Sequence, residues 1–355
     1  MAAADPSDTQ AQNALSISLE RMGVASQQLG KLENARAYFE RKREIDERLV
    51  QLDPRNTKFQ RDLSISYNKL GDVQVQSGQV TEALGSYQKA FEISQKLAAA
   101  DPSDALAQRD LSISYSKLGD VQLQSRQVTE ALGSYQKGLE ISQKLAAADP
   151  SDAQAQRDLA VSFYKLGEAE QAGKQFEKAI AWYEKARDKV KAMQQAARLA
   201  PQDKDMPGMP DRSIQQCRHA ATALGDWKTL VEQPAELLPV LLEMRGTEFV
   251  KEGRIGDAVQ AVAKLRELKT ATAGQLYNAA CVYSLCAGRL GAAPSLPAEQ
   301  SAARQQHIAA ALATLREAIA AGWKDFAHMQ KNPDLAVLRD LPEFKALLPR
   351  SDSDK

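Results

Sequence analysis

Residues 61–108 read RDLSISYNKLGDVQVQSGQVTEALGSYQKAFEISQKLAAADPSDALAQ, and residues 109–156 read RDLSISYSKLGDVQLQSRQVTEALGSYQKGLEISQKLAAADPSDAQAQ. The two stretches differ at six positions, so they are copies of one 48-residue unit. More divergent copies flank them, because Asp-Pro pairs recur with the same period at Asp5-Pro6, Asp53-Pro54, Asp101-Pro102 and Asp149-Pro150. A fixed period of this length predicts a solenoid whose units stack on one another.

Each unit has the pattern of two amphipathic helices. In the third unit, apolar and small residues three or four apart form two successive sets: Leu111, Tyr115, Leu118, Gly119 and Gln122, then Ala131, Leu132, Tyr135, Leu139, Ser142 and Leu145. We expect Thr129 to cap the second helix. Asp149-Pro150 should end it, since proline disfavours a helical conformation in the residue before it. Ser151 and Asp152 suit the next N-cap.

The spacing of Leu118-Gly119, Ala131, Tyr135 and Gly138 resembles the tetratricopeptide repeat. The resemblance implies a right-handed superhelical all-α solenoid of antiparallel helix pairs, in which Gly119 lets the two helices approach and Tyr135 packs below. The family unit has about 34 residues, whereas this one has 48. Longer units of this kind resemble those of kinesin light chains and their bacterial relatives. Matching residues stand in the other units: Met22-Gly23, Ala35 and Phe39; Leu70-Gly71, Ala83 and Tyr87; Leu166-Gly167, Ala179 and Tyr183.

Composition narrows the function classes. Lys plus Arg and Asp plus Glu each number 46, and no basic run is present, which argues against a general nucleic-acid binder. Three cysteines are too few for a disulfide framework and fit a reducing compartment. The N-terminus lacks the pattern of a signal peptide, and no apolar stretch approaches the ~20 residues of a membrane span. We therefore expect a cytoplasmic protein without membrane or nucleic-acid partners.

The second half of the sequence is less regular. We assign 1–200 to an array of four repeats, 201–212 to a proline-containing linker, 213–350 to a degenerate repeat-like helical cap, and 351–355 to a disordered tail. Within the cap, apolar spacing predicts these helices: Ala235–Lys251, Ile255–Leu268, Gln275–Ala287, Ser301–Ala321, Asp334–Arg339 and Pro342–Leu348.

Residues 276–285 and 321–325, with Asn332-Pro333-Asp334-Leu335, resemble the terminal module of planctomycete-type repeat proteins, many of which carry a serine/threonine kinase domain before the repeats. The resemblance covers roughly 245–350 and implies a capping role. Solenoids need such end units. We expect a set of apolar side chains to fold back over the last helix pair, and the alternative is an exposed docking patch: Trp323, Phe326, Leu335, Leu338 and Phe344.

No catalytic pattern is found in the sequence. Phosphate-binding glycine loops and kinase motifs are missing, and the histidines are scattered: His219, His307 and His328. Cys281 and Cys286 are five residues apart, or about 140° around a helix, so they do not converge on a metal. Cys217 and His219 do not converge either. We predict no enzymatic activity, no cofactor and no metal, and we expect the cysteines to be buried small side chains.

The resemblance implies that the first helices line a concave groove that binds protein ligands. Four rows of side chains would face it: Asn68, Ser116 and Tyr164; Asp72, Asp120 and Glu168; Gln76, Gln124 and Ala172; Lys69, Lys117 and Lys165. One interpretation is a solvated face on which Lys and Asp pair locally at i and i+3. The other is a groove for a peptide or helix. The acidic row would repel a carboxylate, so we predict no clamp for the C-terminal carboxylates of chaperones.

Residues 1–8 match residues 97–104, the end of a second helix. This match suggests a chain that continues a longer protein or has a misplaced start codon. The leading function is a scaffold or adaptor whose groove recruits a protein. The alternative is the regulatory or substrate-recruiting part of a larger bacterial signalling enzyme of the serine/threonine kinase type.

Overall fold

The computed structural model describes residues 8–203, 205–291 and 296–349. The first Asp-Pro pair and the predicted tail lie outside these residues. Over the described ranges the chain is helical and has no strand, which confirms the all-α prediction. It divides into two compact units, residues 1–217 and 218–355. No helix of the described ranges combines the length and apolar character that a membrane crossing requires.

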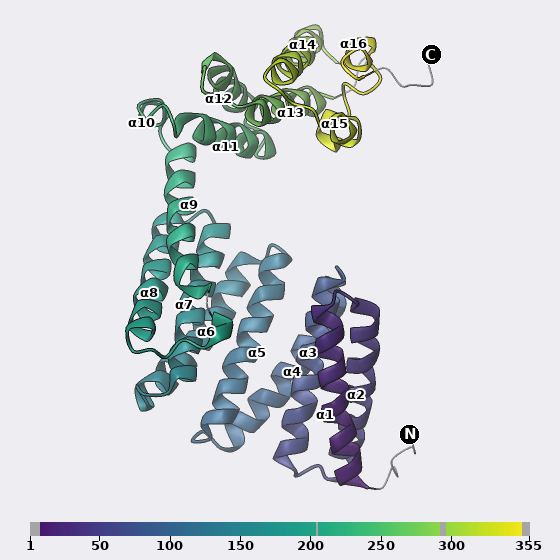
Figure 1. The fold of residues 1–355 in the computed structure, drawn as a ribbon, viewed down its shortest axis with the longest axis vertical. Helices are drawn as coiled ribbons and strands as arrows, with labels where there is room; N and C mark the ends of the chain where they lie inside the picture. Colours follow the sequence, from purple (N-terminus) through teal and green to yellow (C-terminus); the bar gives the residue numbers. More distant parts are fainter. Residues whose placement is uncertain (1–7, 204, 292–295, 350–355) are drawn as a thin grey trace. The chain divides into compact units, whose positions relative to one another are not determined.

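The first unit is a stack of helix pairs (Figure 1). Its first helices begin at residues 9, 57, 105 and 153, so the 48-residue period of the sequence is also the period of the structure. Each helix packs on the one before and the one after it. The first unit is therefore an all-α solenoid of stacked helix pairs, as predicted. The pairs are α1 (Thr9–Gln28) with α2 (Leu32–Leu52), α3 (Thr57–Gln76) with α4 (Val80–Ala100), α5 (Ala105–Gln124) with α6 (Val128–Ala148), and α7 (Ala153–Ala172) with α8 (Phe176–Gln195).

The two helices of a pair begin in different ways. Asp152 caps α7 by accepting from the backbone N–H groups of Gln154 and Ala155, as predicted. The prediction that Thr129 caps α6 is wrong. A tight turn places the N-cap at Gln127, whose side chain makes no capping bond. The backbone N–H of Gln127 instead bonds to the carbonyl of Gln122 at 2.8 Å, so the helix has already begun at Val128.

A glycine of each first helix lies against an aromatic ring of the second. A Cβ atom built on Gly119 would lie 2.5 Å from the ring of Tyr135, closer than real contacts allow. Tyr135 itself is almost fully buried. The other repeats show the same approach, which explains why glycine recurs at this position: Gly23 with Phe39, Gly71 with Tyr87, and Gly167 with Tyr183.

The first repeat differs from the others in its interior, because it buries an ion pair. Lys42 Nζ lies 2.8 Å from Asp46 Oδ2, and both side chains are almost inaccessible to solvent. Asp46 also accepts from Ser16 at 2.6 Å and from Ser66. The second and third repeats carry a serine at the position of Asp46 and a small residue at that of Lys42: Ala90 with Ser94, and Gly138 with Ser142.

A further helix follows the fourth pair. After the short 3-10 helices Pro201–Asp203 and Met206–Gly208, α9 spans Met209–Leu224. Ile214, which stands 48 residues after Leu166, packs with Cys217 on Ala179 and Tyr183 of the fourth repeat. The start of α9 therefore occupies the position of a fifth first helix. The boundaries predicted at 200 and 213 stay predictions, whereas the contacts divide the chain after Cys217.

The second unit contains α10 (Trp227–Val231), α11 (Leu238–Lys251), α12 (Ile255–Glu267), α13 (Ala273–Arg289), α14 (Ala298–Ala320), α15 (Phe326–Lys331), a 3-10 turn (Pro333–Leu335) and α16 (Pro342–Lys345). The helix predicted over 334–339 is wrong. Asp325 caps α15 by accepting from the backbone N–H of His328. Pro333 then holds Asn332 in an extended conformation, which ends α15 and leaves only the short turn.

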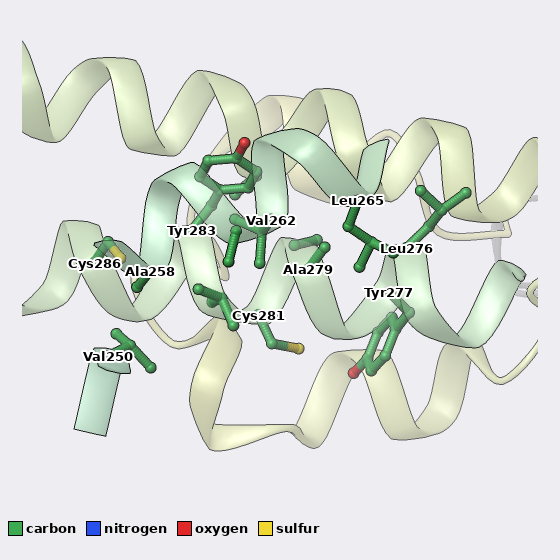
Figure 2. Packing of buried hydrophobic residues seen from close by; sticks show 14 of the residues in the cluster. Val250, Ala258, Val262, Leu265, Leu276, Tyr277, Ala279, Cys281, Tyr283 and Cys286 are labelled. Atoms are coloured by element: carbon green, nitrogen blue, oxygen red, sulfur yellow. The ribbon is translucent and has the colours of Figure 1, made fainter. Parts of the chain in front are cut away.

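The core of this unit lies around α13 (Figure 2). Leu335, Leu338 and Phe344 are buried in it, so these side chains fold inward as predicted. Trp323 stacks on Tyr277 with ring centroids 4.1 Å apart. All three cysteines are free and buried, also as predicted. Burial raises the pKa of Cys281 to about 12 and that of Cys286 to about 11, so both remain neutral thiols at physiological pH.

Candidate partner-binding groove

First and second helices of the array line an open cavity of about 590 Å³. Seven of the side chains predicted for the groove line it: Asp72, Gln76, Lys117, Asp120, Gln124, Lys165 and Glu168. Five more had no signal as groove residues in the sequence: Gln27, Val75, Tyr87, Leu123 and Tyr135. The two tyrosines belong to second helices, so a search confined to the exposed side of the first helices misses them. We call this cavity the groove.

The remaining predicted residues lie elsewhere. Asn68 and Lys69 line a neighbouring cavity of about 310 Å³, which shares Asp72 and Lys117 with the groove. Tyr164 lines two smaller cavities beside α9, and its hydroxyl lies 3.0 Å from Ser213 Oγ. Ser116 lines neither the groove nor the neighbouring cavity. Its hydroxyl donates to the carbonyl of Ser112 on its own helix.

The charged side chains of the groove pair between repeats. Lys117 Nζ lies 2.7 Å from Asp72 Oδ1 of the preceding repeat. Lys165 Nζ likewise lies 3.0 Å from Asp120 Oδ1. The predicted pairing at i and i+3 is seen only where Lys165 also meets Glu168, at 2.9 Å. Charge pairing is therefore only partly local, because the stacked helices bring a lysine of the next repeat within reach of Asp72 and of Asp120.

Tyrosine hydroxyls donate hydrogen bonds to Asp72 and Asp120 and so hold their carboxylates in place. Tyr87 donates to Asp72 Oδ1 at 2.7 Å, and Tyr135 donates to Asp120 Oδ1 at 2.7 Å. Each aspartate thus receives one tyrosine hydroxyl and one lysine ammonium, while part of its side chain stays open to solvent. The second and third repeats consequently present the same three-residue arrangement twice along the groove.

Pairing between repeats leaves one charged side chain at each end of the series without a partner in the adjoining repeat: a lysine at the start and a glutamate at the end. The position that would hold a carboxylate for Lys69 is occupied by Val24, 48 residues before Asp72. At the other end, the position that would hold a lysine for Glu168 is occupied by Ser213, 48 residues after Lys165. Lys165 therefore serves two carboxylates. Lys69, which lines the neighbouring cavity, thus has no carboxylate in the preceding repeat, and Glu168 in the groove has no lysine in the following one.

Burial and neighbouring charges shift several pKa values here. Burial alone would lower the pKa of the Lys165 ammonium, but the carboxylates of Asp120 and Glu168 outweigh it and raise that pKa above its usual range. Burial, followed by the charge of the aspartate each one contacts, raises the pKa of Tyr87 and Tyr135 far above the usual phenol value. These groups keep their protons, and thus their hydrogen bonds, throughout the physiological range.

We expect the array to lose stability as the pH rises above ~10, where free tyrosine ionises. The sign follows from the raised pKa values. The unfolded chain releases phenol protons that the folded chain retains, so the free energy of unfolding falls with pH. Absorbance of phenolate at 295 nm and helical circular dichroism, followed together, should change in one transition. In the Tyr87→Phe, Tyr135→Phe variant the loss should be smaller, and phenolate formation without loss of helix would contradict the prediction.

A second set of ion pairs ties the repeats together beside the groove. Arg61 Nε lies 2.5 Å from Asp110 Oδ2 of the next repeat, and the same arrangement recurs between Arg109 and Asp158. Arg157 continues it by pairing at 2.8 Å with Asp203, which is nearly inaccessible to solvent. The first two pairs join successive first helices, and the third joins α7 to the 3-10 helix Pro201–Asp203, so together they stabilise the stack that forms the groove.

Within the described ranges, no group of three or more His, Cys, Asp or Glu side chains is arranged to hold a metal ion. In the groove, tyrosine hydroxyls bond to aspartates within a repeat, and lysines pair with aspartates across repeats. What the arrangement offers chemically is a set of donors and acceptors with paired charges.

No family model and no curated protein matches this chain. Solved structures do resemble it. BtubC (BKLC) from P. vanneervenii matches at 15% identity over 82% of this chain and 93% of its own, with a TM-score of 0.34. A tetratricopeptide repeat protein from Parabacteroides merdae matches at 15% identity over 91% and 98%, with a TM-score of 0.31. PilF of Pseudomonas aeruginosa matches at 13% over 87% and 99%, with a TM-score of 0.31.

Proposed function

We propose that this chain is a protein-interaction scaffold whose groove binds a segment of a partner protein. The observation that carries the proposal is the duplicated arrangement of tyrosine, aspartate and lysine on consecutive repeats, Tyr87 with Asp72 and Lys117, then Tyr135 with Asp120. Flanking amides and the apolar side chains Val75 and Leu123 complete a surface with donors, acceptors and small apolar contacts. Such a surface suits an extended peptide or a helix.

The charge at the two ends defines the partner segment. An acidic group of the ligand would lie near Lys69 in the neighbouring cavity, which shares Asp72 and Lys117 with the groove, and a basic group near Glu168 in the groove. The segment we propose is therefore bipolar, with acidic residues in one half and basic residues in the other. Complementary charges of this kind raise the association rate and the specificity more than the affinity itself.

Three synthetic peptides of equal length test this proposal: one bipolar, one uniformly acidic and one uniformly basic. In fluorescence anisotropy titrations at low salt, the bipolar peptide should bind about tenfold more tightly than either uniform one. Lys69→Glu and Glu168→Lys should each remove that preference. The double variant should regain it, because an extended peptide can bind in the opposite direction.

Two controls make the test specific to the groove. Glu140→Lys makes the same change on the exposed face of α6 and should leave binding unaltered. The variant with alanine at Asp72, Asp120 and Glu168 should lose the bipolar preference. Unchanged binding by this variant would refute the groove as the site.

We also propose that C-terminal carboxylates of acidic chaperone tails are not bound. Support comes from Asp72 and Asp120. Each already accepts a hydrogen bond from a tyrosine hydroxyl and pairs with a lysine, and its negative charge would repel an incoming carboxylate. Micromolar binding of such a tail peptide would overturn this part of the proposal.

The kinase-associated alternative rests on the second unit, whose sequence resembles the terminal module of planctomycete-type repeat proteins. Likewise, the similarity of the repeats to those of kinesin light chains concerns their length. Both resemblances are proposals about which proteins this chain is related to. The peptide titrations of the groove do not depend on either.

A further inference from the structure

A cavity of about 340 Å³ beside α9 continues the groove, because Lys165 and Glu168 line both. The rest of its wall comes from α7, α8, the start of α9 and the segment that joins α8 to α9. All of its lining residues belong to the first compact unit, so it is a site within the repeat array. We call it the α9 cavity.

The α9 cavity is the repeat equivalent of the neighbouring cavity that holds Asn68 and Lys69. Nine of the ten residues that line the neighbouring cavity have a counterpart in the α9 cavity 96 positions, or two repeats, later in the chain. The groove shares side chains with both cavities. A segment bound along the groove can therefore place one side chain in each of two equivalent cavities.

The charge of this repeated site reverses between the two cavities. The neighbouring cavity is lined by four cations and two carboxylates: Arg61, Lys69, Arg109, Lys117, Asp72 and Asp110. The α9 cavity is lined by two cations and three carboxylates: Arg157, Lys165, Glu168, Asp203 and Asp205. The reversal is sharpest at Asp205, because the residues 48, 96 and 144 positions earlier are all arginine: Arg157, Arg109 and Arg61.

Both cations of the α9 cavity are already paired. Arg157 Nε lies 2.8 Å from Asp203 Oδ1, and Lys165 pairs with Asp120 and Glu168. Asp205 is exposed, and no cation among the described residues pairs with it. A carboxylate is therefore the charge that the cavity leaves for a ligand.

The walls of the α9 cavity are also less polar than those of its equivalent. Met206 and Met209 stand where the neighbouring cavity has Asp110 and Ile113, and Tyr164 stands in place of Asn68. Thioether and aromatic side chains beside a carboxylate suit a ligand group with an apolar stem and a cationic end. Lysine and arginine side chains have this form.

We propose that the α9 cavity binds one long basic side chain, lysine or arginine, of the partner segment. This inference rests on the proposed function of the groove and identifies the residues that select the basic half of the segment. The methylene stem would lie against Met206, Met209 and the ring of Tyr164. The cationic end would meet Asp205, with Glu168 close to the opening from the groove.

A double-mutant cycle tests the contact with Asp205. Each basic residue of the bipolar peptide is replaced in turn by norleucine, which keeps the apolar stem without the charge. With the original chain, one replacement should weaken binding about fivefold at low salt. With Asp205→Asn the same replacement should have little effect. Asp211→Asn is the matched control, because it removes the same charge from an exposed position of α9 that does not line the cavity.

Met209→Lys tests the wall of the cavity, because it places a competing ammonium there. It should weaken the bipolar peptide at least tenfold. Met209 is 37% exposed, so the replacement should leave the fold intact, which circular dichroism verifies.

The results separate this inference from the function it rests on. If Lys69→Glu and Glu168→Lys remove the bipolar preference but no peptide position couples to Asp205, the groove stands and the α9 cavity is not part of the site. Equal effects of Asp205→Asn and Asp211→Asn would show a general attraction of charge and would also overturn the inference. If the bipolar peptide does not bind, the proposed function and this inference fail together.

Discussion

Lys42→Met should lower the free energy of unfolding of the first repeat by about 3–5 kcal/mol, because it leaves the Asp46 carboxylate buried without its cation. Methionine keeps the length of the side chain, so the loss reports the charge and not a cavity. The remaining partners of Asp46 are the hydroxyls of Ser16 and Ser66, which stabilise an anion less than an ammonium does. Urea unfolding followed by circular dichroism measures the change.

The other repeats provide the control. Ser94 stands at the position of Asp46 and forms serine hydrogen bonds on both sides, with Ser64 at 2.9 Å and Ser114 at 3.1 Å. Lys42→Met with Asp46→Ser should therefore recover most of the stability, because an uncharged network replaces the buried ion pair. If Lys42→Met alone is as stable as the original chain, the buried Asp46 carboxylate does not need the Lys42 ammonium, and the prediction is wrong.

Gly119→Ala should lower the free energy of unfolding by about 1–3 kcal/mol, since the added methyl group forces the buried ring of Tyr135 to move. The ring is held at both ends, by the surrounding core and by the hydrogen bond from its hydroxyl to Asp120. Moving it therefore also weakens the arrangement of the groove. The same urea titration measures the change.

Gly133→Ala is the matched control for this substitution. Gly133 lies in α6, where an added Cβ meets nothing within 4 Å. Alanine there should raise stability by about 0.5–1 kcal/mol, because glycine in a helix interior loses more backbone entropy on folding. The same chemical change is thus expected to have opposite signs at the two positions. Loss of stability in both variants, or in neither, would refute the role given to the close approach of Gly119 and Tyr135.

Much of the first unit follows from local sequence. The 48-residue period, the apolar spacing and Asp-Pro punctuation such as Asp149-Pro150 place the helices correctly, because helix formation and capping depend on residues close in the chain. The prediction that Thr129 caps α6 shows where local sequence is not enough. Its residue type suits a cap, but the turn after α5 is closed by a backbone hydrogen bond, and the helix starts without a side-chain cap.

The candidate site was only partly predictable. The polar rows of the first helices contain most of the groove residues, since the repeat register fixes which side chains share a face. The pairing of Lys117 with Asp72 was not predictable from that register, and neither was the contribution of Tyr87. Both depend on how closely successive helices stack, which no single helix face encodes.

The sequence by itself determined that this protein is an array of helix pairs, because repetition makes the same local pattern recur in a fixed phase. The close glycine–aromatic approach in each repeat was implied by the resemblance to the tetratricopeptide repeat. Only the tertiary structure decided that the charges pair between repeats, that α9 takes the place of a fifth first helix, and that Asp205 lines a cavity equivalent to that of Lys69. The physical reason is that charge pairing and burial depend on which helix lies alongside, and that neighbour can be 48 residues away.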